Sequence, residues 1–121
     1  MKTVFLVAVI WLVPIAGHLR WSGVNLKRQA KPGCQSGQHE IGYTTTERSK
    51  STTVYIAFNP PYDQAPAVVW GLTHLDSSHS DNIRINSEIS YLSANGFILK
   101  IYAWGGTLTY NAKVAWMACP K

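Results

Sequence analysis

The chain has 121 residues, which is enough for one small domain. Its formal net charge of +5 comes from the N-terminal part, because from residue 34 onward six basic side chains balance the six acidic ones. A nucleic-acid-binding domain needs its positive charge on the folded surface, so this balance argues against nucleic acid as a partner.

The first 17 residues have the features of a secretory signal peptide. Lys2 supplies a positive start, an apolar stretch runs from Val4 to Ile15, and small residues follow at positions 16 and 17. A membrane anchor is the alternative, but the stretch is short for a spanning helix and Pro14 interrupts it. No later stretch is long and apolar enough to span a bilayer. The mature protein is therefore expected to be secreted and extracellular.

Residues 18–33 form a separate basic segment with no sustained periodicity, closed by Pro32-Gly33. The pair Lys27-Arg28 fits a propeptide cleavage site, and a flexible basic linker is the other interpretation. The folded domain is then expected to span residues 34–121.

The two cysteines, Cys34 and Cys119, lie near the two ends of this domain. In an exported chain an even cysteine pair usually forms a disulfide, which here would join the first strand to the last. In the chain-entropy model a loop of this size gives at most about 4–5 kcal/mol of stabilisation. Bridges between subunits are the alternative.

From residue 34 onward the pattern predicts strands and no helix. An edge strand is expected over 35–41. Apolar and polar residues alternate clearly from Thr52 to Phe58, and the prolines that follow end this strand because proline cannot donate a ladder hydrogen bond. The next strand is expected over 67–75, with buried side chains at Val68, Val69, Trp70 and Leu72.

Residues 82–110 predict the remaining strands. The side chains of Ile83, Ile85, Ile89 and Tyr91 share one face of an extended strand, and Arg84 lies on the opposite, polar face.

Two turns divide this stretch. Asn95-Gly96 predicts a tight turn because both residues tolerate positive φ, and Gly105-Gly106 predicts a second hairpin turn. The strands on either side of them are expected to begin at Phe97 and Thr107 and to share one small sheet. About six antiparallel strands in so short a domain predict an all-β fold, a small six-stranded antiparallel β-sandwich.

Catalytic motifs are missing from the sequence: it has no nucleophile elbow and no phosphate loop. The loop that contains His74, Asp76, His79 and Asp81 suggests a metal site, but its spacing fits neither a zinc motif nor an EF-hand. We therefore predict that the protein is not an enzyme and uses neither a metal nor a cofactor.

Arg84 and Trp104 indicate binding instead. A guanidinium group can donate two hydrogen bonds to vicinal hydroxyls, and an open tryptophan ring can stack on the apolar face of a sugar. The alternative for Arg84 is a surface ion pair, and the alternative for Trp104 is a position in the core. Composition alone favours these two alternatives over a binding site.

The residues from Cys34 to Met117 resemble the H-type lectin domain, known from snail agglutinins and from the C-terminal domain of discoidins. The resemblance depends on the order and spacing of short motifs along the chain. These are Gln35-Ser36-Gly37, Phe58 with Pro61-Tyr62, Val68-Val69, Leu75-Asp76, Asn82 with Arg84, Gly96-Phe97, Tyr102-x-Trp104, Tyr110 and Trp116.

The resemblance implies a six-stranded sandwich that assembles as a homotrimer, with pairing of trimers into hexamers left open. It also implies binding of glycans with terminal N-acetylgalactosamine or galactose near subunit boundaries, without a metal. By position, the site would contain Glu47 as hydrogen-bond acceptor and Arg84 as donor, with Trp104 and Tyr110 lining a wall supplied across the boundary. Arg84 and Trp104 of one chain would then serve different sites.

Two positions depart from the family pattern. The usual aspartate is Glu47, which is one methylene longer, and the histidine expected after the tryptophan is Gly105. The internal disulfide of the snail type is also missing, since Asp63 and Ile101 occupy its positions. The sequence is therefore compatible with two functions. One is a lectin in agglutination, innate defence or cell adhesion, and the other is a sandwich module that has lost sugar binding.

Overall fold

A computed structural model of the chain describes residues 32–121. The expected leader 1–17 and all of the basic segment except Pro32 and Gly33 lie outside the described residues. Six strands make up the described part: β1 (Gln35–Glu40), β2 (Ser51–Ala57), β3 (Ala67–Ser77), β4 (Ile85–Ser90), β5 (Gly96–Ala103) and β6 (Thr109–Cys119).

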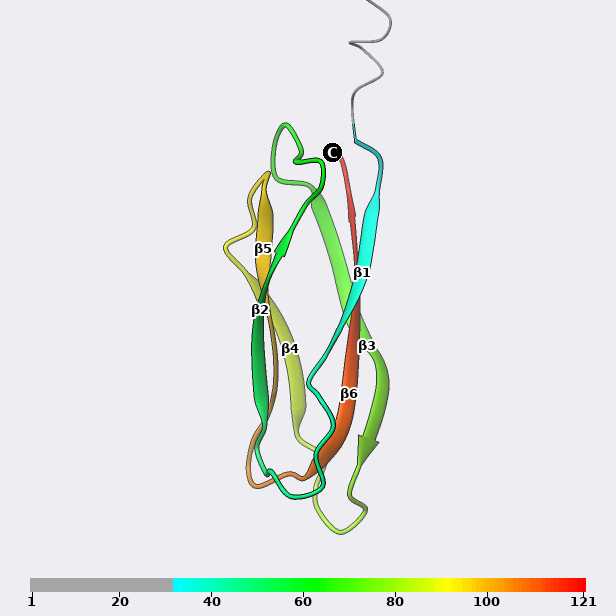
Figure 1. The fold of residues 1–121 in the computed structure, drawn as a ribbon, viewed down its shortest axis with the longest axis vertical. Helices are drawn as coiled ribbons and strands as arrows, with labels where there is room; N and C mark the ends of the chain where they lie inside the picture. Colours follow the sequence, from blue (N-terminus) through cyan, green and yellow to red (C-terminus); the bar gives the residue numbers. More distant parts are fainter. Residues whose placement is uncertain (1–31) are drawn as a thin grey trace, which may run out of the picture. The chain divides into compact units, whose positions relative to one another are not determined.

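The strands form two three-stranded antiparallel sheets that pack face to face (Figure 1). The strand order is β1-β6-β3 in one sheet and β2-β5-β4 in the other. The predicted six-stranded antiparallel β-sandwich is therefore confirmed. The first strand lies at a sheet edge, as predicted.

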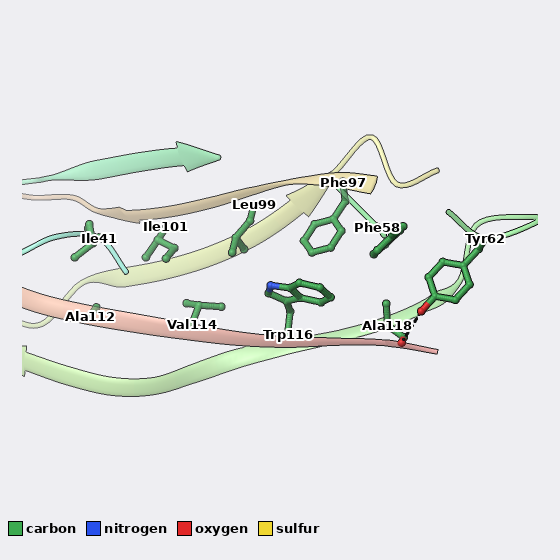
Figure 2. Close-up of a cluster of buried hydrophobic side chains, with 10 residues drawn as sticks. All are labelled: Ile41, Phe58, Tyr62, Phe97, Leu99, Ile101, Ala112, Val114, Trp116 and Ala118. Carbon is green, nitrogen blue, oxygen red and sulfur yellow. Dashed lines mark hydrogen bonds between the residues drawn. The ribbon is translucent and has the colours of Figure 1, made fainter. Parts of the chain in front are cut away.

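The core lies between the two central strands, β5 and β6. Their alternate side chains point inward, and Figure 2 shows these facing rows. A central strand has neighbours on both sides, so its inward side chains are fully shielded. The buried hydrophobic residues of these two strands are Phe97, Leu99, Ile101 and Ala103 from β5, and Ala112, Val114, Trp116 and Ala118 from β6.

Trp116 is the largest of these side chains, and its place depends on Gly37. In register, Gly37 of β1 pairs directly with Trp116 of β6, so both positions face the core. A Cβ atom on Gly37 would lie 2.8 Å from the indole ring. The glycine therefore provides the space that the ring fills, and the ring then packs edge-on against Phe97 at 5.4 Å between centroids.

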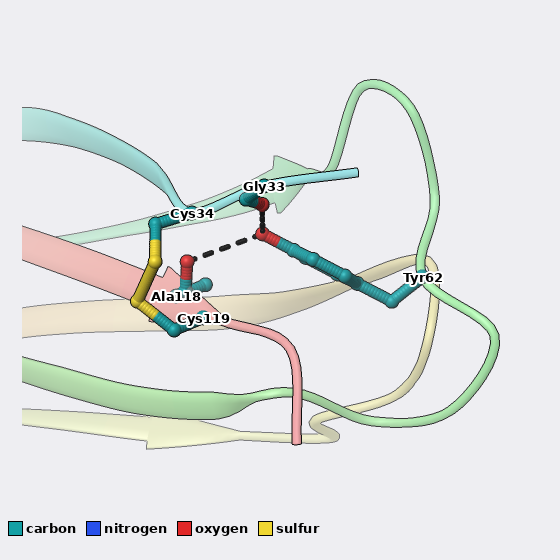
Figure 3. The surroundings of a disulfide bond; sticks show 5 residues. All are labelled: Gly33, Cys34, Tyr62, Ala118 and Cys119. Carbon is teal, nitrogen blue, oxygen red and sulfur yellow. Dashed lines mark hydrogen bonds between the residues drawn. A yellow bond between two sulfur atoms is a disulfide. The ribbon is translucent and has the colours of Figure 1, made fainter. Parts of the chain in front are cut away.

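The Cys34–Cys119 disulfide closes one end of the sandwich (Figure 3). Gln35 pairs with Ala118 in the β1–β6 ladder, which brings the two cysteines opposite each other. The Tyr62 hydroxyl lies 2.8 Å from the carbonyl oxygen of Gly33 and 3.1 Å from that of Ala118, and can donate to either. The predicted link between the first and last strands is thus present within one chain.

The predicted burial of β3 was wrong for three of its four residues. Only Val68 is half-buried, whereas Val69, Trp70 and Leu72 are 67%, 39% and 45% exposed. Val69 points to the outer face, as its register with the exposed Met117 shows. Trp70 and Leu72 pair with core residues and point inward, but β3 is an edge strand and the opposite sheet leaves them partly uncovered.

The predicted faces and turns of residues 82–110 also need three corrections. Ile83 and Tyr91 lie just outside β4 and are 56% and 81% exposed, because the regular strand covers only Ile85–Ser90. β4 and β5 are connected as predicted, but not by a tight turn at Asn95-Gly96: the connection covers residues 91–95, the positive φ is at Tyr91, and Gly96 already pairs with Ala57 as the first residue of β5. Gly105-Gly106 is not a hairpin turn, since it carries the chain from β5 in one sheet to β6 in the other.

Within residues 32–121 the structure contains no helix that is long and apolar enough to cross a membrane.

Candidate functional site

Arg84 and Trp104 lie side by side at one end of the β4–β5 ladder. The last regular pair is Ile85 with Ala103, and one further hydrogen bond extends it, from the Trp104 amide to the Arg84 carbonyl at 3.2 Å. The sequence placed both residues near the same sheet, and the structure agrees. The backbones of the two residues are therefore neighbours within one chain.

Gly105 determines where the Arg84 side chain can lie. Its φ is +68°, a left-handed conformation that glycine adopts without penalty. A Cβ atom at this position would stand 2.9 Å from Cδ and 3.3 Å from Nε of Arg84. The arginine side chain thus crosses directly over the glycine, in space that any larger residue would occupy.

The guanidinium group borders an open polar pocket of about 420 Å³. The pocket lies between the loop after β3 and the turn after β5. Its lining residues are His79, Ser80, Asp81, Asn82, Arg84 and Gly105. Within residues 32–121, Arg84 makes no ion pair and its guanidinium donates no hydrogen bond, so the predicted alternative of a surface ion pair is not seen there.

Three loops are connected around this pocket by hydrogen bonds. Arg48 Nη1 lies 2.7 Å from Asp81 Oδ2 and 2.8 Å from the Gly106 carbonyl oxygen. The Gly106 amide donates to Ser49 Oγ at 2.9 Å. The loop before β2 therefore fixes both the acidic side of the pocket and the turn beside it.

Thr107 joins the same loops from inside. Its side chain is 1% exposed, and Oγ1 lies 2.9 Å from the carbonyl oxygens of both Asn82 and Trp104. Its carbonyl accepts from the Ser49 amide at 2.9 Å. This buried threonine links all three segments, and nothing in its local sequence indicated that role.

Glu47 lies in the loop before β2, away from the lining of this pocket. Its side chain is 60% exposed, and its carboxylate is 3.8 Å from Lys50 Nζ. Its amide donates to Thr44 Oγ1 at 3.0 Å, which gives this loop a tight local turn. The acidic side chain that borders the pocket is Asp81, which the sequence comparison did not nominate.

Trp104 lies on the surface and not in the core. It is 43% exposed, and its ring packs at a tilt against Tyr102, with centroids 5.7 Å apart. The alternative of a core tryptophan is therefore wrong. Tyr110 is half-buried on β6, in the other sheet, and its carbonyl accepts from the Thr44 amide at 2.9 Å.

The structure thus brings Arg84, Trp104 and Gly105 together, and it places Glu47 and Tyr110 by the loop between β1 and β2. The signal that could have revealed Asp81 is its position three residues before Arg84 in a polar loop. Among the described residues, no group of three or more His, Cys, Asp or Glu side chains could hold a metal ion.

Comparison with protein families gives a match to the H-type lectin domain over residues 53–119, which is more than half of the chain. That span includes Arg84, Trp104, Gly105 and Tyr110, and it begins after Glu47.

Two solved structures share the fold. Discoidin II of Dictyostelium discoideum superposes with a TM-score of 0.62 at 20% identity, covering 75% of this chain and 38% of that one. The tailspike protein gp49 of Pseudomonas phage LKA1 gives a TM-score of 0.53 at 22% identity, covering 70% of this chain and 14% of that one. At these identities the likeness establishes the fold only.

One relative in sequence comes from Fuscovulum blasticum and is described as ATP synthase subunits region ORF 7. It is 29% identical over 63 residues, which are 52% of this chain and 55% of the relative. The matched part therefore spans about half the length of that protein.

Proposed function

The chain belongs to the H-type lectin domain family, a family of carbohydrate-binding domains, and from this premise we propose that it binds glycans with terminal N-acetylgalactosamine or galactose. In this proposal it acts as a lectin in agglutination, innate defence or cell adhesion. The leader-like residues 1–17 support its secretion.

The observation that carries the proposal is the uncommitted guanidinium group of Arg84 in a polar pocket. Within residues 32–121 it has no carboxylate partner, although Asp81 borders the same pocket and is paired with Arg48. A guanidinium fork can donate to two adjacent oxygens at once, which suits the vicinal hydroxyls of a sugar.

Trp104 supplies the second element that a sugar needs. Its backbone neighbours that of Arg84, and its partly exposed ring packs at a tilt against Tyr102. Aromatic faces bury the apolar C–H surface of a sugar while hydroxyls are hydrogen-bonded at its edge. In an assembled trimer this face would serve a site shared with a neighbouring subunit.

Self-association is supported by the open edge of the sandwich between β3 and β4. Three side chains of β3 pair in register with core residues and yet stay 38–45% exposed: Trp70, Leu72 and Leu75. The Trp70 indole spans to the opposite sheet, where Nε1 donates to the Ser87 carbonyl at 3.4 Å. Apolar side chains that point toward a core without being covered are typical of surfaces buried by a partner. We assign the homotrimer contact to this edge.

Glycan-array binding of the exported, disulfide-bonded protein tests the sugar proposal. Arrays carrying galactose- and N-acetylgalactosamine-terminated glycans are expected to bind it, and Arg84→Ala is expected to abolish binding while leaving the melting curve nearly unchanged. Lys121→Ala is the matched control, because it removes one exposed positive charge far from the pocket. No binding of any galactose-type ligand at about millimolar concentration would refute the proposal.

The assembly proposal has its own test. Leu72→Arg places a charge on the open edge and is expected to convert trimers into monomers in sedimentation experiments. Val69→Arg is the control, since Val69 lies on the same strand, is more exposed, and points to the outer face. A wild-type protein that sediments as a monomer, or a Leu72→Arg variant that stays trimeric, would refute this edge as the interface.

A second candidate function is an interaction module that has lost sugar binding. Gly105 favours it, because the side chain expected there by family pattern is missing and Arg84 crosses the space it would fill. Wild-type protein that trimerises but binds no glycan would establish this alternative.

A further inference from the structure

Asp81 and Arg84 border the same pocket with opposite charges, and this pair is not the one that the family pattern selects. Glu47, which that pattern selects, has a side chain 60% exposed and lies 3.8 Å from Lys50 Nζ. The Asp81 side chain is only 27% exposed. A carboxylate that is partly shielded from water interacts more strongly with a ligand than one in open solvent.

Arg48 holds Asp81 in one orientation. Its Nη1 atom engages Asp81 Oδ2 at 2.7 Å and is itself fixed by the Gly106 carbonyl at 2.8 Å. The other carboxylate oxygen, Oδ1, accepts no hydrogen bond from any residue between 32 and 121. Asp81 Oδ1 and the Arg84 guanidinium thus belong to two residues that line the pocket with opposite charges, and neither group is used by this part of the chain.

We propose that Asp81, positioned by Arg48, is the carboxylate that accepts hydrogen bonds from sugar hydroxyls in the Arg84 pocket. The inference rests on the proposed lectin function. Each sugar hydroxyl can both donate and accept, so one member of a vicinal pair can donate to Asp81 while its neighbour accepts from Arg84. The polar side of the site then belongs to a single subunit, formed by the loop 79–84 and Gly105.

Arg48 is a positioning residue in this arrangement. Arg48 does not line the pocket itself and would act on the ligand only through Asp81, whose Oδ2 it binds while Oδ1 stays free within the described part of the chain. Its second bond, to Gly106, ties that orientation to the turn over which Arg84 crosses. A change at Arg48 should therefore weaken binding only as long as Asp81 retains its charge.

Binding measurements on the full exported protein separate the two acids. With methyl α-galactoside as the probe, Asp81→Asn is expected to weaken binding by about 10- to 100-fold, the size of a lost hydrogen bond to a charged group. Glu47→Gln, the matched amide substitution, is expected to change it by less than about threefold. If Glu47→Gln abolishes binding and Asp81→Asn does not, the inference is wrong while the proposed function stands.

A double-mutant cycle tests the role of Arg48. Arg48→Met is expected to weaken binding about tenfold in the wild-type background and to have no further effect in the Asp81→Asn background. Arg48→Lys, which keeps the charge, is expected to restore part of the loss. Equal losses from Arg48→Met in both backgrounds would show a general effect on the loops and overturn the positioning role.

Deoxy sugars provide a test that needs only the wild-type protein and one Asp81 variant. If Asp81→Asn folds poorly, Asp81→Glu can serve as that variant. The probes are methyl galactosides that lack the hydroxyl at position 3 or at position 4. One of them is expected to bind the wild type at least about tenfold more weakly and to lose no further affinity when Asp81 is changed. If both deoxy probes bind the wild type with the same affinity as the parent sugar, Asp81 accepts no hydrogen bond from a hydroxyl at these positions, and the inference fails. If the wild type binds no galactoside, the proposed function fails with it.

Discussion

The two ends of β6 are held by different chemistry. At its C-terminal end, near Cys119, the contacts are mainly covalent and apolar: the disulfide, and a group of aromatic rings that includes Phe58 and Trp116 at 6.2 Å between centroids, with the Tyr62 hydroxyl as a polar addition. At its other end, near Thr107, polar side chains and backbone groups connect three loops. The first end holds the fold mainly through its covalent bond and its rings, whereas the second presents polar groups around a pocket.

Removing the disulfide is expected to have the largest effect on stability of the changes that separate these two ends. Replacing both Cys34 and Cys119 by serine is expected to lower the free energy of unfolding by about 4–5 kcal/mol at most, because the bond closes a loop with a sequence separation of 85 residues. Chemical denaturation measures the loss. Sugar binding well below the melting temperature is expected to stay unchanged, and a parallel loss of affinity in the folded variant would show that the two ends are coupled.

The same substitution at two buried threonines tests whether hydrogen bonds stabilise the end of β6 near Thr107. Thr107→Val is expected to cost about 1–3 kcal/mol, because it removes the buried hydroxyl shared by the carbonyls of Asn82 and Trp104, of which, within residues 32–121, only that of Trp104 keeps another donor, the Thr107 amide at 3.4 Å. Thr109→Val is the control: this residue is fully buried too, but its Oγ1 has no hydrogen-bond partner among the described residues. It is expected to be neutral or stabilising. Similar melting shifts for both would contradict the role assigned to Thr107.

Two adjacent glycines give the smallest change in stability and the sharpest test of the pocket. Gly105→Ala and Gly106→Ala should each cost about 1–2 kcal/mol, since both residues have a left-handed φ. Only the first displaces Arg84, because nothing lies within 4 Å of a Cβ at Gly106. Titration with galactosides is therefore expected to show weakened binding for Gly105→Ala alone. Equal affinities would mean that the position of Arg84 is not set by Gly105.

Much of the fold could be predicted because strand patterns are local. The alternation in β2 and the pairing of the two terminal cysteines depend on neighbouring residues or on simple pairing rules, and both were confirmed. The tight turn predicted at Asn95-Gly96 was not, because the chain turns over residues 91–95 with its positive φ at Tyr91. The turn at Gly105-Gly106 was misjudged because the glycines show that the chain bends and not which sheet it enters. The exposure of Trp70 and Leu72 was missed for a related reason, since a sequence pattern identifies apolar side chains but not an edge strand.

The site was less accessible to sequence reasoning. Arg84, Trp104 and Gly105 were found through the family pattern, and the structure places them together, but their role in binding stays a prediction. The contact between Arg48 and Asp81 joins residues 33 positions apart in two loops that have no periodicity. Only the folded chain shows that these loops meet.

The disulfide also has a mechanical consequence. Cys34 and Cys119 are neighbours across the β1–β6 ladder, so a pulling force applied at residues 33 and 120 would pass through the covalent bond. The 85-residue loop between them, with the Arg84 pocket at its far end, would carry almost none of that load. Single-molecule extension from these two positions would therefore reveal the shielded length only after reduction of the disulfide.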